Sequence, residues 1–234
     1  MYTLEIVPGF YQITVRYANV FLAAEKDLTL IDTGFRGSMP VVVELIRKLG
    51  RKPEEIKQVI LTHNHLDHTG GLEELRKLAA VKVAAHRADV NIPEGIFPYP
   101  AGDYLGKVLK ASVFSPLKRR LVLDERQIDI SLEGGEVFDI LGGLKVIPTP
   151  GHTAGSISLH APAHKLLIAG DALNKRGDVL RMPLKTVNTD IEVAAASIRK
   201  MAELDVEILC VGHGRPIMRN ARTNLRALVS RLDS

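Results

Sequence analysis

The chain has 234 residues, of which 46% are hydrophobic and 25% are charged, and its net charge is +4. This composition predicts one globular domain over residues 1–234 with a sizeable core. No apolar run reaches the roughly 18 residues of a membrane span, the N-terminus lacks signal-peptide features, and the single cysteine, Cys210, excludes an internal disulfide. We therefore expect a cytoplasmic protein that does not bind membranes.

Strand-like and helix-like patterns mix along both halves of the chain, which predicts an α/β fold. Apolar, β-branched runs predict strands over residues 11–17, 19–23, 28–31 and 81–85, and a strand-rich stretch over 128–170. Apolar residues at helical spacing predict helices over 39–49, 68–79 and about 191–204. The last of these begins with a capping box of Thr189 and Glu192. A C-terminal helix has an arginine-rich face, which we interpret as solvated rather than as a nucleic-acid surface.

Residues 91–127 interrupt this pattern and are interpreted as an insertion or lid segment. The segment is rich in proline and glycine, and it holds four aromatic residues, among them Tyr99 and Tyr104. A purely solvated loop would not concentrate aromatic side chains in this way. We expect the segment either to form a wall that binds substrate, through Tyr99 and Tyr104, or to pack on the core or against a second copy of the chain in a homodimer.

Seven histidine and aspartate residues form a pattern that predicts a metal site. They are His63, His65, Asp67 and His68 within six positions, followed by His152, Asp171 and His213. Imidazole nitrogens and carboxylate oxygens are good ligands for zinc and related divalent cations. So many titratable groups packed together would repel one another unless a cation held them. The remaining histidines are interpreted as hydrogen-bonded core residues.

The predicted ligands also share a structural context, because each follows an apolar run that predicts a strand. Residues 59–61 precede His63, residues 166–168 precede Asp171, and residues 208–211 precede His213. Strands of a buried sheet bring such ends to one edge, where open α/β folds place their sites.

These motifs resemble the metallo-β-lactamase fold superfamily, and the resemblance spans about residues 18–215. The run from His63 to His68 is similar to the family's His-x-His-x-Asp-His signature, and His152, Asp171 and His213 match its later motifs in order. The family fold is an αββα four-layer sandwich of two mixed sheets flanked by helices, with the site at one edge. Residues 30–34, with Asp32 at their centre, resemble the family's first motif.

The resemblance also implies a role for each residue. His63, His65 and His152 would bind a first metal, and Asp67, His68 and His213 would bind a second. Asp171 would bridge the two metals, with a hydroxide between them. Asp32 would support a ligand without binding metal, although as a turn residue it is equally suited to capping the helix that follows.

The chemistry that follows is hydrolysis of an ester-like bond, such as a lactone or a thioester. Two divalent cations, which we expect to be Zn²⁺ with Fe and Mn as alternatives, would activate the bridging hydroxide and polarise a carbonyl oxygen. Asp67 would orient the hydroxide and pass a proton to the leaving group. The site would keep net positive charge, which favours a small anionic substrate.

Two other reactions remain open within the superfamily. Persulfide dioxygenases share these motifs but use a single iron, and a further branch cleaves phosphodiesters or nucleic acids. Acyl-homoserine lactonases are also similar, but they carry tyrosine three residues after the bridging aspartate. Asn174 occupies that position here and is a candidate substrate contact.

Overall fold

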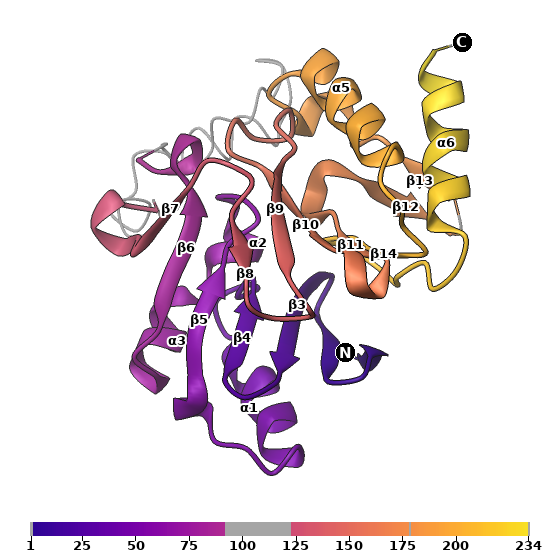
Figure 1. The fold of residues 1–234 in the computed structure, drawn as a ribbon. Coiled ribbons are helices and arrows are strands. Elements are labelled where there is room, and N and C mark those ends of the chain that lie inside the picture. Colours follow the sequence, from indigo (N-terminus) through magenta and orange to yellow (C-terminus); the bar gives the residue numbers. More distant parts are fainter. Residues whose placement is uncertain (1, 92–122, 178, 234) are drawn as a thin grey trace.

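The computed structural model describes residues 2–91, 123–177 and 179–233, and two β-sheets form its centre (Figure 1). The seven-stranded sheet contains, in spatial order, β1 (Tyr2–Val7), β2 (Phe10–Val15), β3 (Ala18–Ala24), β4 (Leu28–Ile31), β5 (Ile56–Ile60), β6 (Lys82–His86) and β7 (Ile130–Leu132). The five-stranded sheet has the order β14 (Ile208–Cys210), β11 (Leu166–Ile168), β10 (Ile157–Ala161), β9 (Leu144–Pro148) and β8 (Val137–Phe138). A separate ribbon pairs β12 (Asn174–Arg176) with β13 (Val179–Arg181).

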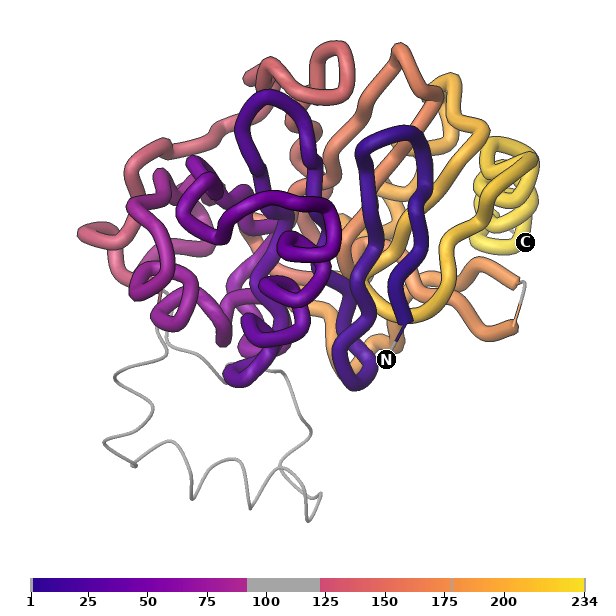
Figure 2. Tube along the Cα trace, turned by 90° about the horizontal axis from the view of Figure 1, so that it is seen from below, coloured from indigo at the N-terminus to yellow at the C-terminus, as the bar shows by residue number. Residues whose placement is uncertain are grey.

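Helices cover the outer face of each sheet. Within the described residues, the α-helices are α1 (Met39–Lys48), α2 (Leu66–Thr69), α3 (Leu72–Leu78), α5 (Ile191–Ala202) and α6 (Ala221–Leu232). Short 3₁₀ turns are η1 (Pro53–Glu55), η2 (Arg87–Asp89), η4 (Glu125–Gln127), η5 (Pro162–His164), η6 (Gly170–Ala172) and η7 (Lys185–Val187). The described residues up to Leu132 build the seven-stranded sheet with its helices, and those after it build the five-stranded sheet with its helices, as the colours of Figure 2 show.

Three apolar layers hold this arrangement together, and they follow from the two-residue period of the strands. In β4, Leu30 packs under α1 and α3 while Ile31 faces the other sheet. In β11, Leu167 packs under α5 and α6 while Ile168 faces inward. Strands that are apolar on both sides are buried on both sides, which confirms the predicted αββα sandwich.

The strand directions place the predicted ligands. Strands β4, β5, β6 and β7 are parallel to one another, and β11 is parallel to β14. The carboxyl ends of β4 and β5 therefore lie on one edge and lead to Asp32 and His63, while those of β11 and β14 lead to Asp171 and His213. The two sheets present these ends to each other.

Two of the predicted helices begin or continue differently from the prediction. The helix predicted over residues 68–79 is divided into α2 and α3, because the Gly71 N–H bonds to Gly34 O at 3.1 Å and leaves the helical ladder. A Cβ on Gly70 or Gly71 would collide with the backbone of residues 33–36, so both positions need glycine. Helix α5 is capped by Asp190 rather than Thr189, since the Asp190 carboxylate accepts from the N–H groups of Glu192 and Val193.

The ends of the segment over residues 91–127 lie next to each other. The Asn91 N–H donates to Leu123 O at 2.8 Å, and Asn91 Oδ1 accepts from the Glu125 N–H at 3.1 Å. Tyr99 and Tyr104 lie outside the described residues, so the wall predicted from them stays a prediction. In the part of the chain that the structure describes, none of the helices has the length and apolar content needed to cross a bilayer.

Candidate metal centre

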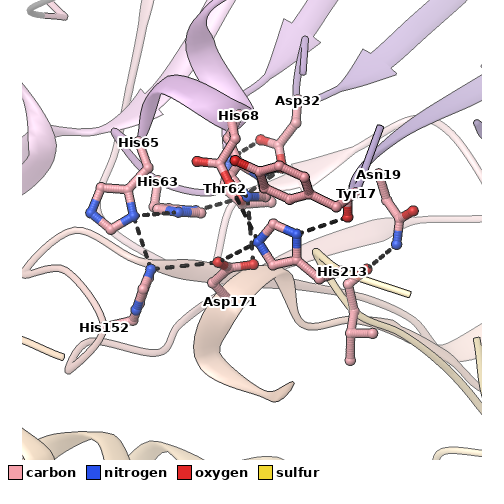
Figure 3. Close-up of polar contacts among 12 residues, drawn as sticks. Tyr17, Asn19, Asp32, Thr62, His63, His65, His68, His152, Asp171 and His213 are labelled. Atoms are coloured by element: carbon pink, nitrogen blue, oxygen red, sulfur yellow. Dashed lines mark hydrogen bonds and ion pairs between the residues drawn. The ribbon is translucent and has the colours of Figure 1, made fainter. Parts of the chain in front are cut away.

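Three histidines from two loops form what we call the first triad: His63, His65 and His152. His63 Nε2 lies 3.1 Å from His65 Nδ1, and His152 Nε2 lies 3.0 Å from the same atom (Figure 3). Burial lowers the pKa of His63 well below its ordinary value, and burial together with the charge of His152 lowers the pKa of His65 to about 3. These imidazoles are therefore neutral at physiological pH and offer lone pairs to a common point.

Asp67, His68 and His213 form the second triad. Asp67 Oδ2 lies 3.4 Å from His213 Nε2 and 3.8 Å from His68 Nε2. The other ring nitrogen of each histidine is held from behind: His68 Nδ1 lies 2.7 Å from Asp32 Oδ2, and His213 Nδ1 lies 2.9 Å from Tyr17 O. A donor at Nδ1 leaves the Nε2 lone pair of each ring directed at the cluster.

Asp171 lies between the triads and contacts residues of both. Its Oδ2 lies 3.0 Å from His213 Nε2 and 3.6 Å from His152 Nε2, and its Oδ1 lies 3.5 Å from His68 Nε2. Glycine makes this approach sterically feasible, because a Cβ on Gly212 would collide with Asp171 Oδ1 and His68 Cε1. The carboxylate is therefore close to both triads, and the bridging role that the resemblance implies for it stays a prediction.

The pKa values of Asp171 and His68 show that this part of the cluster stabilises positive charge. Burial alone would raise the pKa of Asp171, but His68, His213 and His152 lower it below its ordinary value. Burial would likewise lower the pKa of His68, yet Asp171 and Asp32 raise it to about 10. In the metal-free protein a proton on His68 therefore offsets part of the carboxylate charge, and a metal cation can take over that role.

The donor set fits divalent metal ions. In each of three overlapping groups, the first triad, the second triad and His63 with His68 and Asp171, the candidate ligand atoms lie within 4.8 Å of one another. His68 Nε2 and Asp171 Oδ1 are buried, and within the described residues neither makes a hydrogen bond. Buried polar atoms without a hydrogen bond are costly, and metal coordination would satisfy both.

Asp32 supports the ligands rather than capping a helix. Its Oδ1 accepts from the Thr62 N–H at 2.7 Å, and its Oδ2 accepts from the Thr62 hydroxyl at 2.8 Å as well as from His68. Since the Thr62 hydroxyl donates to Asp32, it accepts from His63 Nδ1 at 3.0 Å, which leaves His63 Nε2 free as a ligand. Ser38 occupies the N-cap of α1. Asp32 therefore sets the tautomers of one histidine in each half of the centre.

Other predicted residues lie apart from this network. Asn174 is exposed on β12, and its Oδ1 accepts from the Lys175 N–H at 2.6 Å. Cys210 is buried between the sheets, and burial raises the pKa of its thiol, in agreement with a core role.

Sequence reasoning missed two residues. Tyr17 lies in the turn between β2 and β3. The residue is 60% exposed, and its ring lies beside that of His213. Asp89, buried after β6, bonds to both loops of the first triad. Neither stands in a recognisable motif.

Comparison with known proteins identifies the family. The model of the Metallo-beta-lactamase superfamily matches residues 13–213. The chain belongs to this superfamily. It is 34% identical over 247 residues to the probable metallo-hydrolase YflN of Bacillus subtilis. The alignment covers 98% of this chain and 93% of that protein. It is also 27% identical over 177 residues to a hydroxyacylglutathione hydrolase of Cereibacter sphaeroides. That alignment covers 75% of this chain and 55% of that protein.

Solved structures agree on the fold. A metallo-beta-lactamase family protein from Thermus thermophilus superposes with a TM-score of 0.72 at 22% identity, covering 98% of this chain and 81% of that one. A subclass B3 metallo-beta-lactamase from a soil metagenome gives 0.69 at 21% identity, covering 100% and 94%. The family match and the histidine and aspartate clusters together identify the chain as a probable metal-dependent hydrolase of this superfamily.

Proposed function

We propose that the chain hydrolyses an ester-like bond of a small molecule, a lactone or a thioester, at a centre that holds two zinc ions. The observation that carries this proposal is the sharing of Asp171 by two complete triads. His63, His65 and His152 would hold one ion, Asp67, His68 and His213 the other, and Asp171 both. Two bound divalent cations supply an activated water nucleophile and polarise the substrate carbonyl.

The protein's own residues would orient the reactants and move the proton. Asp67 is the more accessible of the two carboxylates, with 20% of its side chain exposed against 13% for Asp171. Its Oδ2 faces the cluster, so it can orient the nucleophile, accept the proton that the nucleophile gives up, and pass that proton to the leaving oxygen or sulfur. Asp171 is more enclosed by histidines and would keep a positional role.

The charge balance and the neighbouring surface bear on the substrate. Two divalent ions outweigh the charges of Asp67 and Asp171, so the site would attract a carboxylate or a developing oxyanion. Beside the second triad, Tyr17 and Phe35 pack edge to face with ring centroids 4.8 Å apart. The exposed Tyr17 ring offers an apolar contact to an acyl chain. One relative is named for a thioester substrate, which supports including thioesters among the first compounds tested.

Elemental analysis of protein purified without added metal or chelator is the first experiment. We expect about two zinc ions per chain, followed by measurable turnover of a lactone or thioester in a substrate screen. One iron per chain, with oxygen uptake in the presence of a persulfide, would instead identify a dioxygenase. Turnover confined to phosphodiesters would also contradict the proposal.

A further inference from the structure

A buried carboxylate outside both triads connects the two loops that carry the first triad. Asp89 follows β6 at the end of η2 and is 3% exposed. Its Oδ2 accepts from the Asn64 N–H at 3.0 Å and from the Thr153 hydroxyl at 2.7 Å, while its Oδ1 accepts from the Gly155 N–H at 2.6 Å. Asn64 stands between His63 and His65, and Thr153 follows His152.

The local structure is built around this carboxylate. A Cβ on Gly155 would lie 2.7 Å from Asp89 Oδ1, so glycine is needed for the close approach. The Thr153 N–H also donates to Ser156 Oγ at 3.0 Å, which closes a tight turn beside His152. One side chain therefore holds three donors from two loops that are separated by about 90 positions in the sequence.

We propose that Asp89 is a positioning residue that sets the spacing of the first triad, and hence the affinity of that triad for its metal ion. Its hydrogen bonds go to Asn64, Thr153 and Gly155, which are neighbours of the ligands in the sequence, so it would act through the loops that carry them. Residues that orient metal ligands from behind commonly change metal affinity by about 10- to 100-fold when they are altered.

Burial and hydrogen bonding act on the charge of Asp89 in opposite directions. Burial raises the pKa of Asp89 above its ordinary value even though Thr153, Gly155 and Asn64 donate to it. A carboxyl whose pKa rises on folding is less favourably ionised in the fold than in the unfolded chain, so its charge opposes folding at neutral pH. The three hydrogen bonds therefore offset part of the cost of burying this charge, and they do so by holding the two loops.

The Asp89→Asn variant separates the two roles because it keeps the shape and removes the charge. Asparagine has one acceptor oxygen, so in either orientation its amide N–H₂ would face the N–H of Asn64 or of Gly155. Two donors facing each other would push one loop away. A structural role predicts lower stability of the whole fold, whereas the positioning role predicts a change confined to the first triad.

The test is a Co²⁺ titration, followed by visible absorption, in two backgrounds. His213→Ala disables the second triad and reports the first, and His152→Ala does the reverse. We expect Asp89→Asn to weaken Co²⁺ binding by about 10- to 100-fold in the His213→Ala background and by less than about threefold in the His152→Ala background. Equal weakening in both backgrounds, or no weakening in the first, would overturn the inference.

Three further variants guard against misfolding. Thr153→Val removes one donor and should reproduce a smaller part of the loss, while Thr153→Ser should restore binding. Asp129→Asn is the matched control, because Asp129 Oδ2 accepts from the Val83 N–H at 2.8 Å at the opposite end of β6. Its Co²⁺ affinity should equal that of the parent background.

This inference rests on the metal centre of the proposed function, but not on its substrate. A natural chain that binds no Co²⁺ would overturn both. Co²⁺ binding that Asp89→Asn leaves unchanged would overturn the inference alone. Failure of every lactone and thioester tested would overturn the proposed substrate class and leave the inference standing.

Discussion

The two triads use histidine in opposite electrostatic settings. In the first triad the pKa of His63 lies well below its ordinary value and that of His65 is about 3, in both cases because burial comes first and neighbouring imidazoles add to it. In the second triad, carboxylates outweigh burial and raise the pKa of His68 to about 10. The first triad is therefore ready for a cation, whereas the second holds a proton that a cation must displace.

Of the changes considered, the loss of Asp171 should have the largest effect on metal content and activity, because both triads contact this residue. Asp171→Ala removes the contact with both triads, so we expect loss of both metal ions and a fall in kcat/KM of at least about a thousandfold, equivalent to about 4 kcal/mol. Elemental analysis and initial rates measure the two losses together. Asp205→Ala is the control, because Asp205 is exposed and pairs with Lys165 on the surface. Retention of two metal ions by Asp171→Ala would contradict the bridging role.

A methyl group added at Gly212 should have a smaller effect than the loss of Asp171, because it crowds the candidate ligands without removing one. Gly212→Ala places a methyl group against Asp171 Oδ1 and His68 Cε1, so the bridging carboxylate and the second triad must shift. A displacement of about 1 Å in such a centre can reduce activity by about a hundredfold, and metal content should fall with it. Gly50→Ala is a control at an open position, where φ is +72° and nothing lies within 4 Å. It should lower the melting temperature modestly and leave metal content unchanged.

Lowering the pH should weaken metal binding at the second triad more than at the first, because the histidine pKa values of the two triads are shifted in opposite directions. Below pH 10, metal-free His68 carries a proton that must leave when a cation binds, so affinity falls as pH falls. Between about pH 8 and about pH 6, one such proton weakens binding to the second triad by about a hundredfold. The pKa values of His63, His65 and His152 are lowered, so the first triad should change little. Co²⁺ titration of His152→Ala and His213→Ala at both pH values measures this; parallel curves would contradict it.

How much of this centre the sequence predicts depends on the range of the contacts involved. The spacing of His63, His65 and His68 is local, and strand ends such as Ile168 before Asp171 follow from apolar runs, so the clustering of these side chains and the sandwich could be predicted. Asp89 could not, because its three donors come from positions that only folding brings near it. A single aspartate after a strand has no pattern of its own.

The errors in the helices have the same origin. The apolar spacing of residues 68–79 suits one helix, but Gly71 bonds to Gly34, which a local pattern does not contain. Thr189 suits an N-cap, but its N–H and hydroxyl both bond to Gly151 O beside His152, and Asp190 becomes the cap instead. In both places a hydrogen bond to a residue distant in the sequence overrides local preference.

The smallest expected effect tests how Asp32 divides its influence between the triads. Thr62→Val removes the hydroxyl that links Asp32 to His63 Nδ1 and leaves the bond from His68 to Asp32 in place. Without that acceptor, His63 can carry its proton on Nε2, so affinity at the first triad should fall by about tenfold. Thr62→Ser keeps the hydroxyl and should bind as the parent does. Since His68 keeps its partner, the second triad in the His152→Ala background should lose less than about threefold. An equal loss at both triads would mean that Thr62 supports the loop as a whole, and that the tautomer of His63 is held by something other than the chain from Asp32 through Thr62.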